Sequence, residues 1–280
     1  MTDTVITSAR SYLYVPGDDS AKLAKAPIRG ADALIVDLED ALAPGRQEYA
    51  RQCTAKAVGA WPVKAAAWIR VPPHSWSDDL RGLPLERIRG VILAKADRTS
   101  LTALSAWLAA HAPQVGLAAL IETAPALLDV AAMTKVPGVS FVMLGEADLR
   151  AELGVRQQSD GRELDTHRHQ LVLASAAAGI NPPVAPMSAD FHDLGSLAAS
   201  SHRLRDMGFW GRTAIHPAQV RVINDAFSPT LDERNQALDV ITRFDQAVAE
   251  AKGVAVDAAG RMIDEALVRS ARRTLNAFRD

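Results

Sequence analysis

The chain alternates short apolar runs with longer amphipathic stretches, and this order constrains the fold more than any other feature of the sequence. Such alternation is typical of repeated strand–helix units. We predict strands at 12–15, 33–37, 66–71, 90–95, 116–121, 140–144, 183–186 and 213–216. We predict helices at 20–29, 46–60, 99–111, 124–133, 165–178, 190–207 and 217–226.

An α/β barrel of eight parallel strands, the (β/α)8 or TIM barrel, accounts for this order within one domain. Such a barrel commonly takes about 250 residues, and the chain has 280. An open doubly wound sheet is the alternative, but the chain lacks the G-x-G-x-x-G phosphate-binding pattern typical of that fold. We therefore predict a TIM-barrel catalytic domain over residues 1–228.

The chain continues beyond the eighth strand–helix unit. Residues 231–251 and 264–278 have helical patterns, and a turn containing Gly and Asp joins them at 253–260. These additional C-terminal helices exceed what a barrel needs. We predict that residues 229–280 form a helical extension that packs on the barrel or on a neighbouring subunit.

Charge and cysteine content exclude several classes of protein. The net charge of −2, from 31 basic and 33 acidic residues, gives no reason to expect nucleic acid or an anionic membrane as a partner. The single cysteine, Cys53, excludes an internal disulfide framework. The first ten residues do not resemble a secretion signal, and no stretch approaches the roughly 18 uninterrupted apolar residues of a membrane span. We expect a cytoplasmic protein.

Two of the predicted strands lead into carboxylates. Residues 116–121 run directly into Glu122, and residues 140–144 are followed by Glu146 and Asp148. In barrels of parallel strands the chemistry lies at the carboxyl ends of the strands. Two acidic side chains from neighbouring strands would there form a pocket for a hard divalent cation. The sequence therefore predicts a metal-dependent enzyme.

A second acidic cluster follows the second predicted strand. Asp37, Glu39 and Asp40 lie within four residues, and such a cluster needs cations or hydrogen-bond donors to offset its repulsion. Arg70 ends the third predicted strand and Lys95 ends the fourth, so both would stand at the same mouth. Each of these residues alone is typical of a solvated surface. Acids, an arginine and a lysine at successive strand ends together indicate an active site.

The histidines and serines give weaker signals. His167 and His169 are two residues apart in a predicted helix, which places them on different faces and argues against a shared metal. His216 ends the eighth predicted strand and is either structural or part of the pocket. No serine occupies a G-x-S-x-G pattern, which counts against an α/β-hydrolase triad.

Short motifs occur in order along nearly the whole chain. They are R-S-Y-L-Y-V-P-G-D at 10–18, L-E-D-A at 38–41, R-V at 70–71, A-K at 94–95, I-E-T at 121–123, G-E-A-D-L at 145–149, A-I-H-P at 214–217 and G-R-M-I-D at 260–264. Together they resemble the motifs of the HpcH/HpaI aldolase and citrate lyase β-subunit-like family, on the citrate lyase β side. Each motif is short, but their common order is a specific signal.

The resemblance implies a TIM barrel that binds Mg2+, acts on acyl thioesters, usually of coenzyme A, and assembles as a homotrimer or hexamer. It implies that Glu122 and Asp148 bind the metal. Arg70 matches the arginine that clamps the substrate in the family. Glu39 and Asp40 match acids that support the metal's waters and the arginine.

Three further residues are singled out by the resemblance alone. Asp264 matches an acid that in relatives reaches a neighbour's site, and Lys22 and Lys25 lie where basic residues of relatives meet the phosphates of the thioester carrier. Ala94 departs from the usual proline of L-P-K, and V-P-P-H at 71–74 departs from the more common arginine–isoleucine–asparagine stretch. These departures concern the part of the pocket that binds the acyl group and leave the metal pair untouched.

The leading functional hypothesis is a Mg2+-dependent carbon–carbon lyase that cleaves or forms a β-hydroxyacyl-CoA thioester such as citryl-, malyl- or citramalyl-CoA. Arg70 would stabilise the thioester enolate, and Asp264 would exchange the proton at its carbon. A malyl-CoA-type thioesterase is an alternative in which the same groups polarise the thioester carbonyl for attack by water. A pyruvate aldolase without coenzyme A and a citrate lyase β subunit that depends on an acyl-carrier protein are the remaining alternatives.

Overall fold

The structure of the chain is a computed structural model that describes residues 9–62, 64–158, 161–250, 254–257 and 259–278. The chain divides into two compact units, Met1–Asp225 and Ala226–Asp280. The first unit contains the barrel and the candidate site, and the second consists of the C-terminal helices and a short hairpin.

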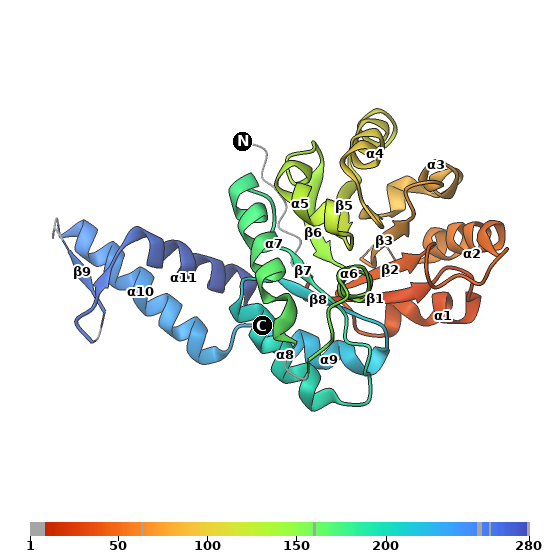
Figure 1. The fold of residues 1–280 in the computed structure, drawn as a ribbon. Coiled ribbons are helices and arrows are strands. Elements are labelled where there is room, and N and C mark those ends of the chain that lie inside the picture. Colours follow the sequence, from red (N-terminus) through yellow and green to blue (C-terminus); the bar gives the residue numbers. More distant parts are fainter. Residues whose placement is uncertain (1–8, 63, 159–160, 251–253, 258, 279–280) are drawn as a thin grey trace. The chain divides into compact units, whose positions relative to one another are not determined.

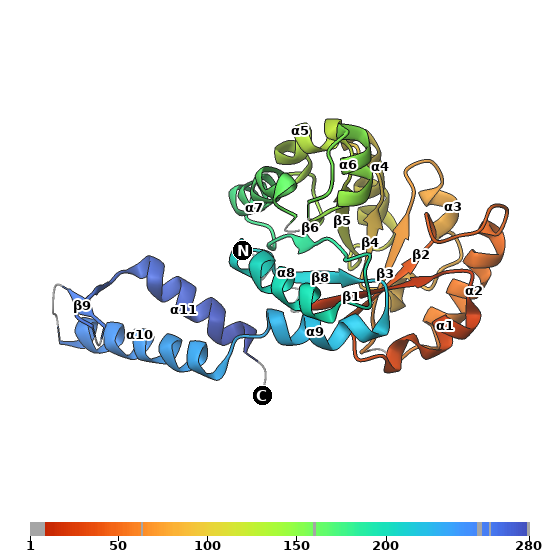
Figure 2. The ribbon, with the colours of Figure 1, turned by 60° about the horizontal axis from the view of Figure 1, so that its bottom comes forward.

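Eight parallel strands close into a barrel in the order of the chain, as predicted (Figures 1 and 2). The strands are β1 (Ser11–Pro16), β2 (Ala33–Asp37), β3 (Ala66–Val71), β4 (Gly90–Leu93), β5 (Gly116–Ile121), β6 (Val139–Leu144), β7 (Val184–Ala185) and β8 (Gly211–Ala214). The α/β TIM-barrel prediction is confirmed.

Helices surround the barrel on its outside (Figure 1). They are α1 (Ser20–Lys25), α2 (Gln47–Ala60), α3 (Trp76–Leu80), α4 (Arg98–His111), α5 (Ala124–Met133), α6 (Glu146–Leu153), α7 (Asp165–Ala178), α8 (Leu194–Asp206) and α9 (Pro217–Phe227), with short 3-10 turns at Ala26–Ile28, Leu85–Arg87 and Arg162–Leu164.

Large side chains fill the interior of the barrel. Trp68 and Phe141 pack edge to face with ring centroids 4.9 Å apart, and the Tyr12 ring centroid lies 5.8 Å from that of Phe141. A methyl group on Gly90 would lie 2.2 Å from the Trp68 ring, so the indole needs a glycine at this point of β4. Away from the carboxyl ends of the strands, the barrel interior is therefore a packed core. The open space lies at the carboxyl ends.

The register of the strands brings polar residues together at those ends. Asp37, the last residue of β2, is paired with Arg70 in β3, and Ile121 of β5 is paired with Leu144 of β6. The residue that follows Ile121 is Glu122, and Gly145 follows Leu144. Neighbouring strand ends thus present the predicted site residues at one mouth.

Several boundaries differ from the sequence prediction. The strand predicted at 90–95 ends at Leu93, because the chain turns at Lys95, which has a φ of +43°. The helix predicted from residue 190 begins at Leu194 with Asp193 as its N-cap, and the α-helix predicted at 20–29 ends at Lys25. The helix α6, directly after β6, was not predicted.

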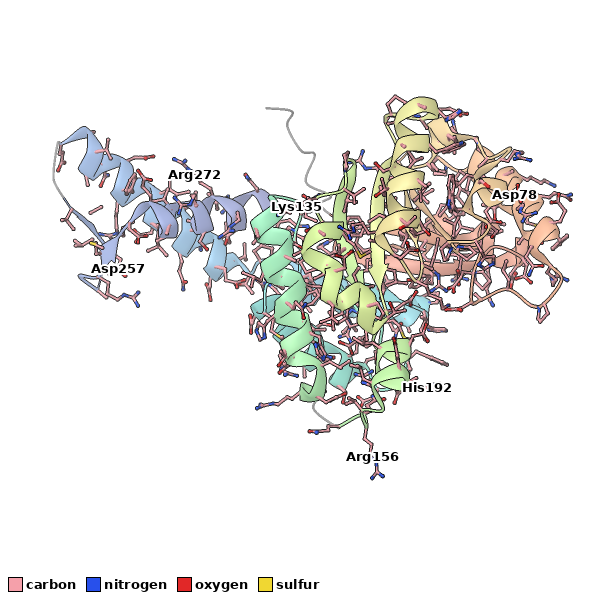
Figure 3. All side chains as sticks on the ribbon, turned by 45° about the horizontal axis from the view of Figure 1, so that its top comes forward. Asp78, Lys135, Arg156, His192, Asp257 and Arg272 are labelled. Carbon is pink, nitrogen blue, oxygen red and sulfur yellow. The ribbon has the colours of Figure 1, made fainter. Side chains whose placement is uncertain are left out.

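The second unit contains α10 (Leu231–Ala249), α11 (Glu265–Ala277) and an antiparallel pair, β9 (Ala255–Val256) with β10 (Met262–Ile263). Thr230 and Glu233 form a capping box at the start of α10, a device that satisfies two free amides of a helix N-terminus. The β9–β10 hairpin replaces part of the turn predicted at 253–260, of which residues 253 and 258 lie outside the described residues. Figure 3 labels Asp257, after β9, and Arg272, on α11.

Among the described residues, none of the helices combines the length and the apolar character that crossing a bilayer requires.

Candidate active site

A cavity of about 1150 Å³ lies at the carboxyl ends of the barrel strands. Its walls come from the ends of β1, β2, β3, β5 and β6, from β8, from α6, α7 and α8, from described residues between 154 and 161, and from the loop at 186–190. Arg156 and His192, on the loops that follow α6 and precede α8, are labelled in Figure 3. Glu122, Asp148, Arg70 and Asp40, four of the predicted site residues, line this one cavity.

Arg70 is held by a buried bidentate ion pair. Its Nε donates to Oδ1 of Asp37 at 2.7 Å and its Nη2 donates to Oδ2 at 2.6 Å. Asp37 also accepts from the backbone amides of Glu39 and Ala41, at 3.0 and 3.1 Å. Arg70 is only 8% exposed. Although burial opposes the charged form, the hydrogen bonds that Arg70 donates to Asp37 and the negative charges around it raise the pKa of Arg70 above its usual range, so the guanidinium is a fixed cation.

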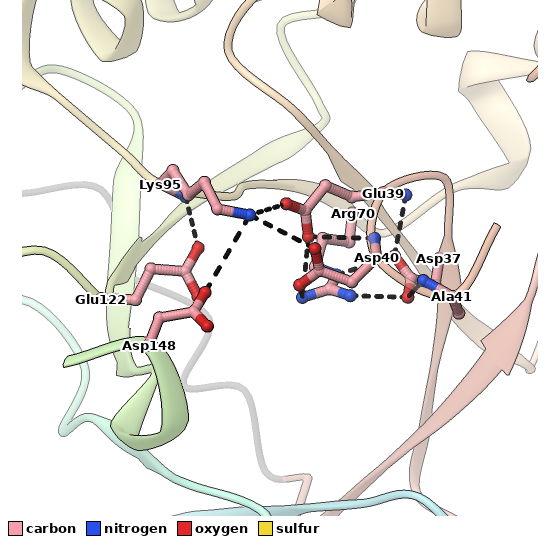
Figure 4. A network of polar contacts seen from close by, with 8 residues as sticks. All are labelled: Asp37, Glu39, Asp40, Ala41, Arg70, Lys95, Glu122 and Asp148. Atoms are coloured by element: carbon pink, nitrogen blue, oxygen red, sulfur yellow. Dashed lines mark hydrogen bonds and ion pairs between the residues drawn. The ribbon is translucent and has the colours of Figure 1, made fainter. Parts of the chain in front are cut away.

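The acids after β2 share two cations. Nη1 of Arg70 lies 3.1 Å from Oε2 of Glu39 and 3.4 Å from Oδ2 of Asp40. The ammonium of Lys95 contacts Glu39 and lies 3.3 Å from Oδ1 of Asp40 (Figure 4). Burial raises the pKa of Glu39 in spite of these cations, whereas Glu39, Arg70 and Lys95 together lower the pKa of Asp40. The structure thus brings the acidic cluster, the arginine and the lysine together.

Glu122 lies between this cluster and Asp148, the second carboxylate of the predicted metal pair. Its Oε1 accepts a 2.5 Å hydrogen bond from the backbone amide of Lys95, and its side chain packs against Gly145. The ammonium of Lys95 lies 4.0 Å from Oδ2 of Asp148. Figure 4 shows Glu122 and Asp148 beside one another, with the lysine between them and Glu39. The two carboxylates therefore face the same part of the cavity.

The charge on Glu122 is poorly compensated. Burial raises the pKa of Glu122 to about 7, and the charges of Glu39 and Asp148 add to this effect, while the Lys95 amide and Arg70 oppose it. A cation between Glu122 and Asp148 would relieve this strain. The described residues include no group of three or more His, Cys, Asp or Glu side chains arranged to hold a metal. Two carboxylates that line one cavity suit an ion that takes few carboxylates and keeps several waters, as Mg2+ does.

Tyr14, in β1, forms part of the cavity floor and was not singled out from the sequence. The guanidinium of Arg70 lies over its ring, 5.0 Å from the centroid. Burial raises the pKa of Tyr14 above its usual value, so its phenol stays protonated and can donate a hydrogen bond. The sequence offered one indication of this role. Tyr14 comes two residues after Tyr12 in the predicted strand, so both side chains lie on the same face of that strand.

Two predicted site residues lie outside the cavity, and a third belongs to the second unit. Lys22 and Lys25 are exposed on α1, where Lys22 pairs with Asp19 at 3.2 Å, and neither lines the cavity. Asp264 belongs to the second unit, where its carboxylate caps α11 by accepting from the amide of Leu267 at 2.8 Å. The geometry of the first unit therefore gives no support for these three assignments.

The histidine left open by the sequence has a structural role. Nδ1 of His216 accepts from the amide of Ala218, and its ring stacks on Phe191 at 4.9 Å. His216 does not belong to the residues that line the cavity. Arg212, in β8, also lines the cavity and was not singled out from the sequence: β8 begins at Gly211, two residues before the predicted start at Thr213, so Arg212 fell outside the predicted strand.

Comparison with known proteins supports the motif analysis. The family model described as HpcH/HpaI aldolase/citrate lyase matches residues 10–217. A (3S)-malyl-CoA thioesterase of Cereibacter sphaeroides is 33% identical over 271 residues, which cover 95% of this chain and 93% of that protein. A mitochondrial citramalyl-CoA lyase of Mus musculus is 28% identical, with 94% of this chain and 83% of that protein covered.

The barrel is also similar to a solved structure. The citrate lyase β subunit of M. tuberculosis, complexed with oxaloacetate and magnesium, superposes with a TM-score of 0.68 and is 25% identical, over 80% of this chain and 99% of that one. Named relatives thus include lyases and a thioesterase, whose names refer to different reactions of related thioesters.

Proposed function

Because this chain belongs to the HpcH/HpaI aldolase/citrate lyase family, we propose that it is a Mg2+-dependent carbon–carbon lyase. Its substrate would be a β-hydroxyacyl-CoA thioester such as citryl-, malyl- or citramalyl-CoA, cleaved or formed according to the direction of the reaction. The observation that carries the proposal is the pair Glu122 and Asp148, open to the cavity beside the buried guanidinium of Arg70.

Glu122 and Asp148 would hold the ion. Their donor set fits, since both are carboxylates, both line the cavity, and Glu122 carries a charge that the protein leaves poorly compensated. When bound, Mg2+ would act as a Lewis acid toward substrate oxygens. The M. tuberculosis relative that is complexed with magnesium and a keto acid supports this choice of ion.

Arg70 would stabilise the anion released by cleavage. Breaking the carbon–carbon bond of a β-hydroxyacyl thioester leaves a thioester enolate, whose charge needs a preorganised donor. A guanidinium has five N–H donors. Asp37 occupies one on Nε and one on Nη2, and Nη1 contacts Glu39 and Asp40, which leaves the second N–H of Nη2. The ion pair with Asp37 fixes the plane of the guanidinium, so this donor is oriented before the substrate binds. Asp37 is therefore a positioning residue for Arg70.

Glu39, Asp40 and Lys95 would keep the two halves of the site in place. Glu39 contacts both Arg70 and Lys95, and Lys95 in turn holds Glu122 through its amide. For Asp264 we propose proton exchange at the enolate carbon, and for Lys22 and Lys25 contact with the phosphates of the thioester carrier. These last three roles rest on the motif resemblance.

A thioesterase is the second candidate, favoured by the 33% identity to the (3S)-malyl-CoA thioesterase. In that reaction the same carboxylate pair and Arg70 would serve a thioester carbonyl attacked by water. A carrier-protein-dependent citrate lyase β subunit would use the same groups on a substrate that is attached to an acyl-carrier protein.

Product analysis separates these reactions. Purified protein with Mg2+ is incubated with malyl-, citramalyl- and citryl-CoA, and the products are identified by chromatography. A lyase gives acetyl-CoA and a keto acid, whereas a thioesterase gives free coenzyme A and an intact hydroxy acid. Glu122→Gln and Asp148→Asn should each abolish turnover while leaving the fold intact by circular dichroism. Full turnover in excess chelator, or in either variant, would refute the metal-dependent mechanism.

A further inference from the structure

Arg212 is a buried cation that only neutral groups contact. It is 5% exposed and points outward from β8 toward α8. Its Nε donates to the carbonyl oxygen of Pro186 at 2.9 Å, and its Nη1 donates to the hydroxyls of Ser200 and Ser201, both at 2.8 Å. The carbonyl of Leu197 is a fourth, longer contact at 3.3 Å. Among the described residues, no carboxylate oxygen lies within the 4.0 Å that defines an ion pair.

The neighbouring arginines are paired. Nη2 of Arg150 lies 2.8 Å from Glu146, and Nε of Arg168 lies 2.6 Å from the other oxygen of that carboxylate. Arg203, on α8, contacts Asp165. The acids at this end of the cavity are thus already engaged by other arginines, and Arg212 is the exception.

Asp193, the residue before α8 and part of the cavity wall, is engaged as well. Asp193 accepts from the amide of Ser196 at 2.9 Å and from its hydroxyl at 2.6 Å, as the N-cap of the helix. Burial lowers the pKa of Arg212 to about 10, an effect that the charge of Glu146 partly opposes and that of Arg168 increases. A buried charge without a counter-ion is costly in free energy.

The guanidinium opens onto the cavity. Arg212 lines the cavity together with Ser196, Ser200 and Arg203, which lie at four- and three-residue spacing along one face of α8. Its second amino nitrogen, Nη2, has no hydrogen-bond partner in the described part of the chain and is not enclosed by protein. We call this part of the cavity, lined by Ser196, Ser200, Arg203 and Arg212, the Arg212 pocket.

We propose that the Arg212 pocket binds the oxyanion of a small molecule, a carboxylate or a phosphate, on Nη2 of Arg212. An oxyanion there supplies the missing counter-charge, and hydrogen bonds between ionised partners are stronger than neutral ones. Because Nε and Nη1 are already occupied, the anion binds through one amino group rather than through the bidentate fork. The site differs from the metal pair. Arg212 extends from β8 toward α8, where it contacts Ser201, whereas Glu122 is two residues after Leu120, a residue of the barrel core.

Binding is measured by isothermal titration calorimetry on metal-free protein in chelator, at constant ionic strength, with inorganic phosphate and succinate as probes. The variants are Arg212→Met, Arg212→Lys and, as a matched control, Arg221→Met, whose side chain is 93% exposed in the same unit. Losing one hydrogen bond to a charged group should weaken anion binding about tenfold or more in Arg212→Met. Arg221→Met should bind as the unmodified protein does.

Arg212→Lys keeps the buried charge and tests the proposal even where Arg212→Met does not fold. It should still bind the anion, more weakly than the unmodified protein, because the lysine cannot reproduce the planar fork that orients Nη2. If neither probe binds the unmodified protein, or if either Arg212 variant binds a probe with unchanged affinity, the proposal is wrong.

A third variant distinguishes this site from the proposed metal site. Glu122→Gln should leave the anion affinity unchanged, even though it removes a proposed metal ligand. Loss of anion binding in Glu122→Gln would place the anion at the metal pair and overturn the proposal, whatever the outcome for the proposed lyase reaction. Kinetics with the acyl-CoA substrate then identify the source of the oxyanion. Competitive inhibition by the probe indicates a group of the substrate itself, and noncompetitive inhibition indicates a separate ligand.

Discussion

The backbone amide of Lys95 donates a hydrogen bond to the carboxylate of Glu122, while the ammonium of the same residue contacts Glu39. One residue therefore joins a proposed metal ligand to the acidic cluster that surrounds Arg70. The amide points at Glu122 because Lys95 has a φ of +43°, the only positive φ of a non-glycine residue in the described part of the chain. In residues other than glycine, a positive φ causes steric strain between the side chain and the backbone. Residues strained in this way are common at functional sites.

The strain at Lys95 is measurable with two substitutions. Lys95→Ala and Lys95→Gly both remove the ammonium, but only glycine adopts a positive φ without strain. The free energy of unfolding of Lys95→Gly should therefore exceed that of Lys95→Ala by about 1 kcal/mol. Urea denaturation of metal-free protein measures both values. Equal stabilities would mean that the backbone at this position is not strained.

The barrel was predictable because its strands are short apolar runs. The bounds of β2, β3 and β5, and of α5 and α7, agree with the sequence prediction. In β2 every residue is buried. A strand that is buried on both faces appears in the sequence as a continuous apolar run, without alternating polar residues, and can be recognised from that run. The expected position of Arg70 at a strand end followed from the same pattern, since the parallel register places it beside Asp37.

Features set by tertiary contacts were not predictable. The helix α6 has only eight residues, too few for a helical period of apolar residues to stand out in the sequence. The left-handed conformation of Lys95 is stabilised by a partner, Glu122, that is 27 residues away in the sequence. Arg212 gave no signal because its partners are carbonyls and hydroxyls from α8 and from Pro186, the residue after β7, and such neutral partners leave no charge pattern in the sequence.

Mg2+ binding should depend on pH through Glu122. A proton on Glu122 competes with the ion, and the pKa of this carboxyl in the metal-free chain is about 7. The apparent affinity for Mg2+ should therefore fall by about tenfold per pH unit below 7 and level off above it. Titration calorimetry at pH 6, 7 and 8 measures this dependence. Glu122→Gln provides the control, since any residual binding in that variant should lack the step near pH 7.

The same group should affect the stability of the metal-free protein. The folded-state pKa of Glu122 is raised from its ordinary value of 4.5 to about 7, so the folded state binds the proton more tightly than the unfolded state does. Its contribution to stability is fully present below pH 4.5 and is lost as the pH rises to 7. The stability of the unmodified protein relative to Glu122→Gln should decline across this window, as measured by chemical denaturation. A constant difference would contradict the raised pKa.

Asp37 should be essential for the stability of the site. Asp37→Asn leaves the buried guanidinium of Arg70 facing an amide group, and breaking a buried ion pair in this way costs about 3–5 kcal/mol. Asp225→Asn is the matched control, because its pair with Arg221 is exposed on both sides and should contribute less than about 1 kcal/mol. Thermal and urea denaturation measure both differences. A loss of similar size in the two variants would show that the Asp37–Arg70 pair contributes no more than a surface ion pair.

Gly145 should be required for the position of Glu122. A methyl group built on Gly145 would lie 2.4 Å from Cβ of Glu122 and 2.6 Å from its Oε2, distances at which the carboxylate has to move. Gly145 has a φ of −93°, which alanine also adopts, so Gly145→Ala changes the packing and not the backbone preference. Overpacking of this kind costs about 1–3 kcal/mol of stability. A displacement of about 1 Å in a reacting group lowers turnover by up to about 100-fold.

Gly59→Ala controls for the added methyl group. Gly59 lies in α2, and nothing lies within 4 Å of the position of its added methyl carbon. This variant should gain about 0.5–1 kcal/mol of stability, because alanine is the better helix former, and its Mg2+ affinity should be unchanged. Gly145→Ala should bind Mg2+ more weakly in calorimetry while remaining folded. Unchanged Mg2+ affinity in Gly145→Ala would mean that the position of the Glu122 carboxylate does not determine metal binding, and Glu122 would then no longer be the proposed ligand.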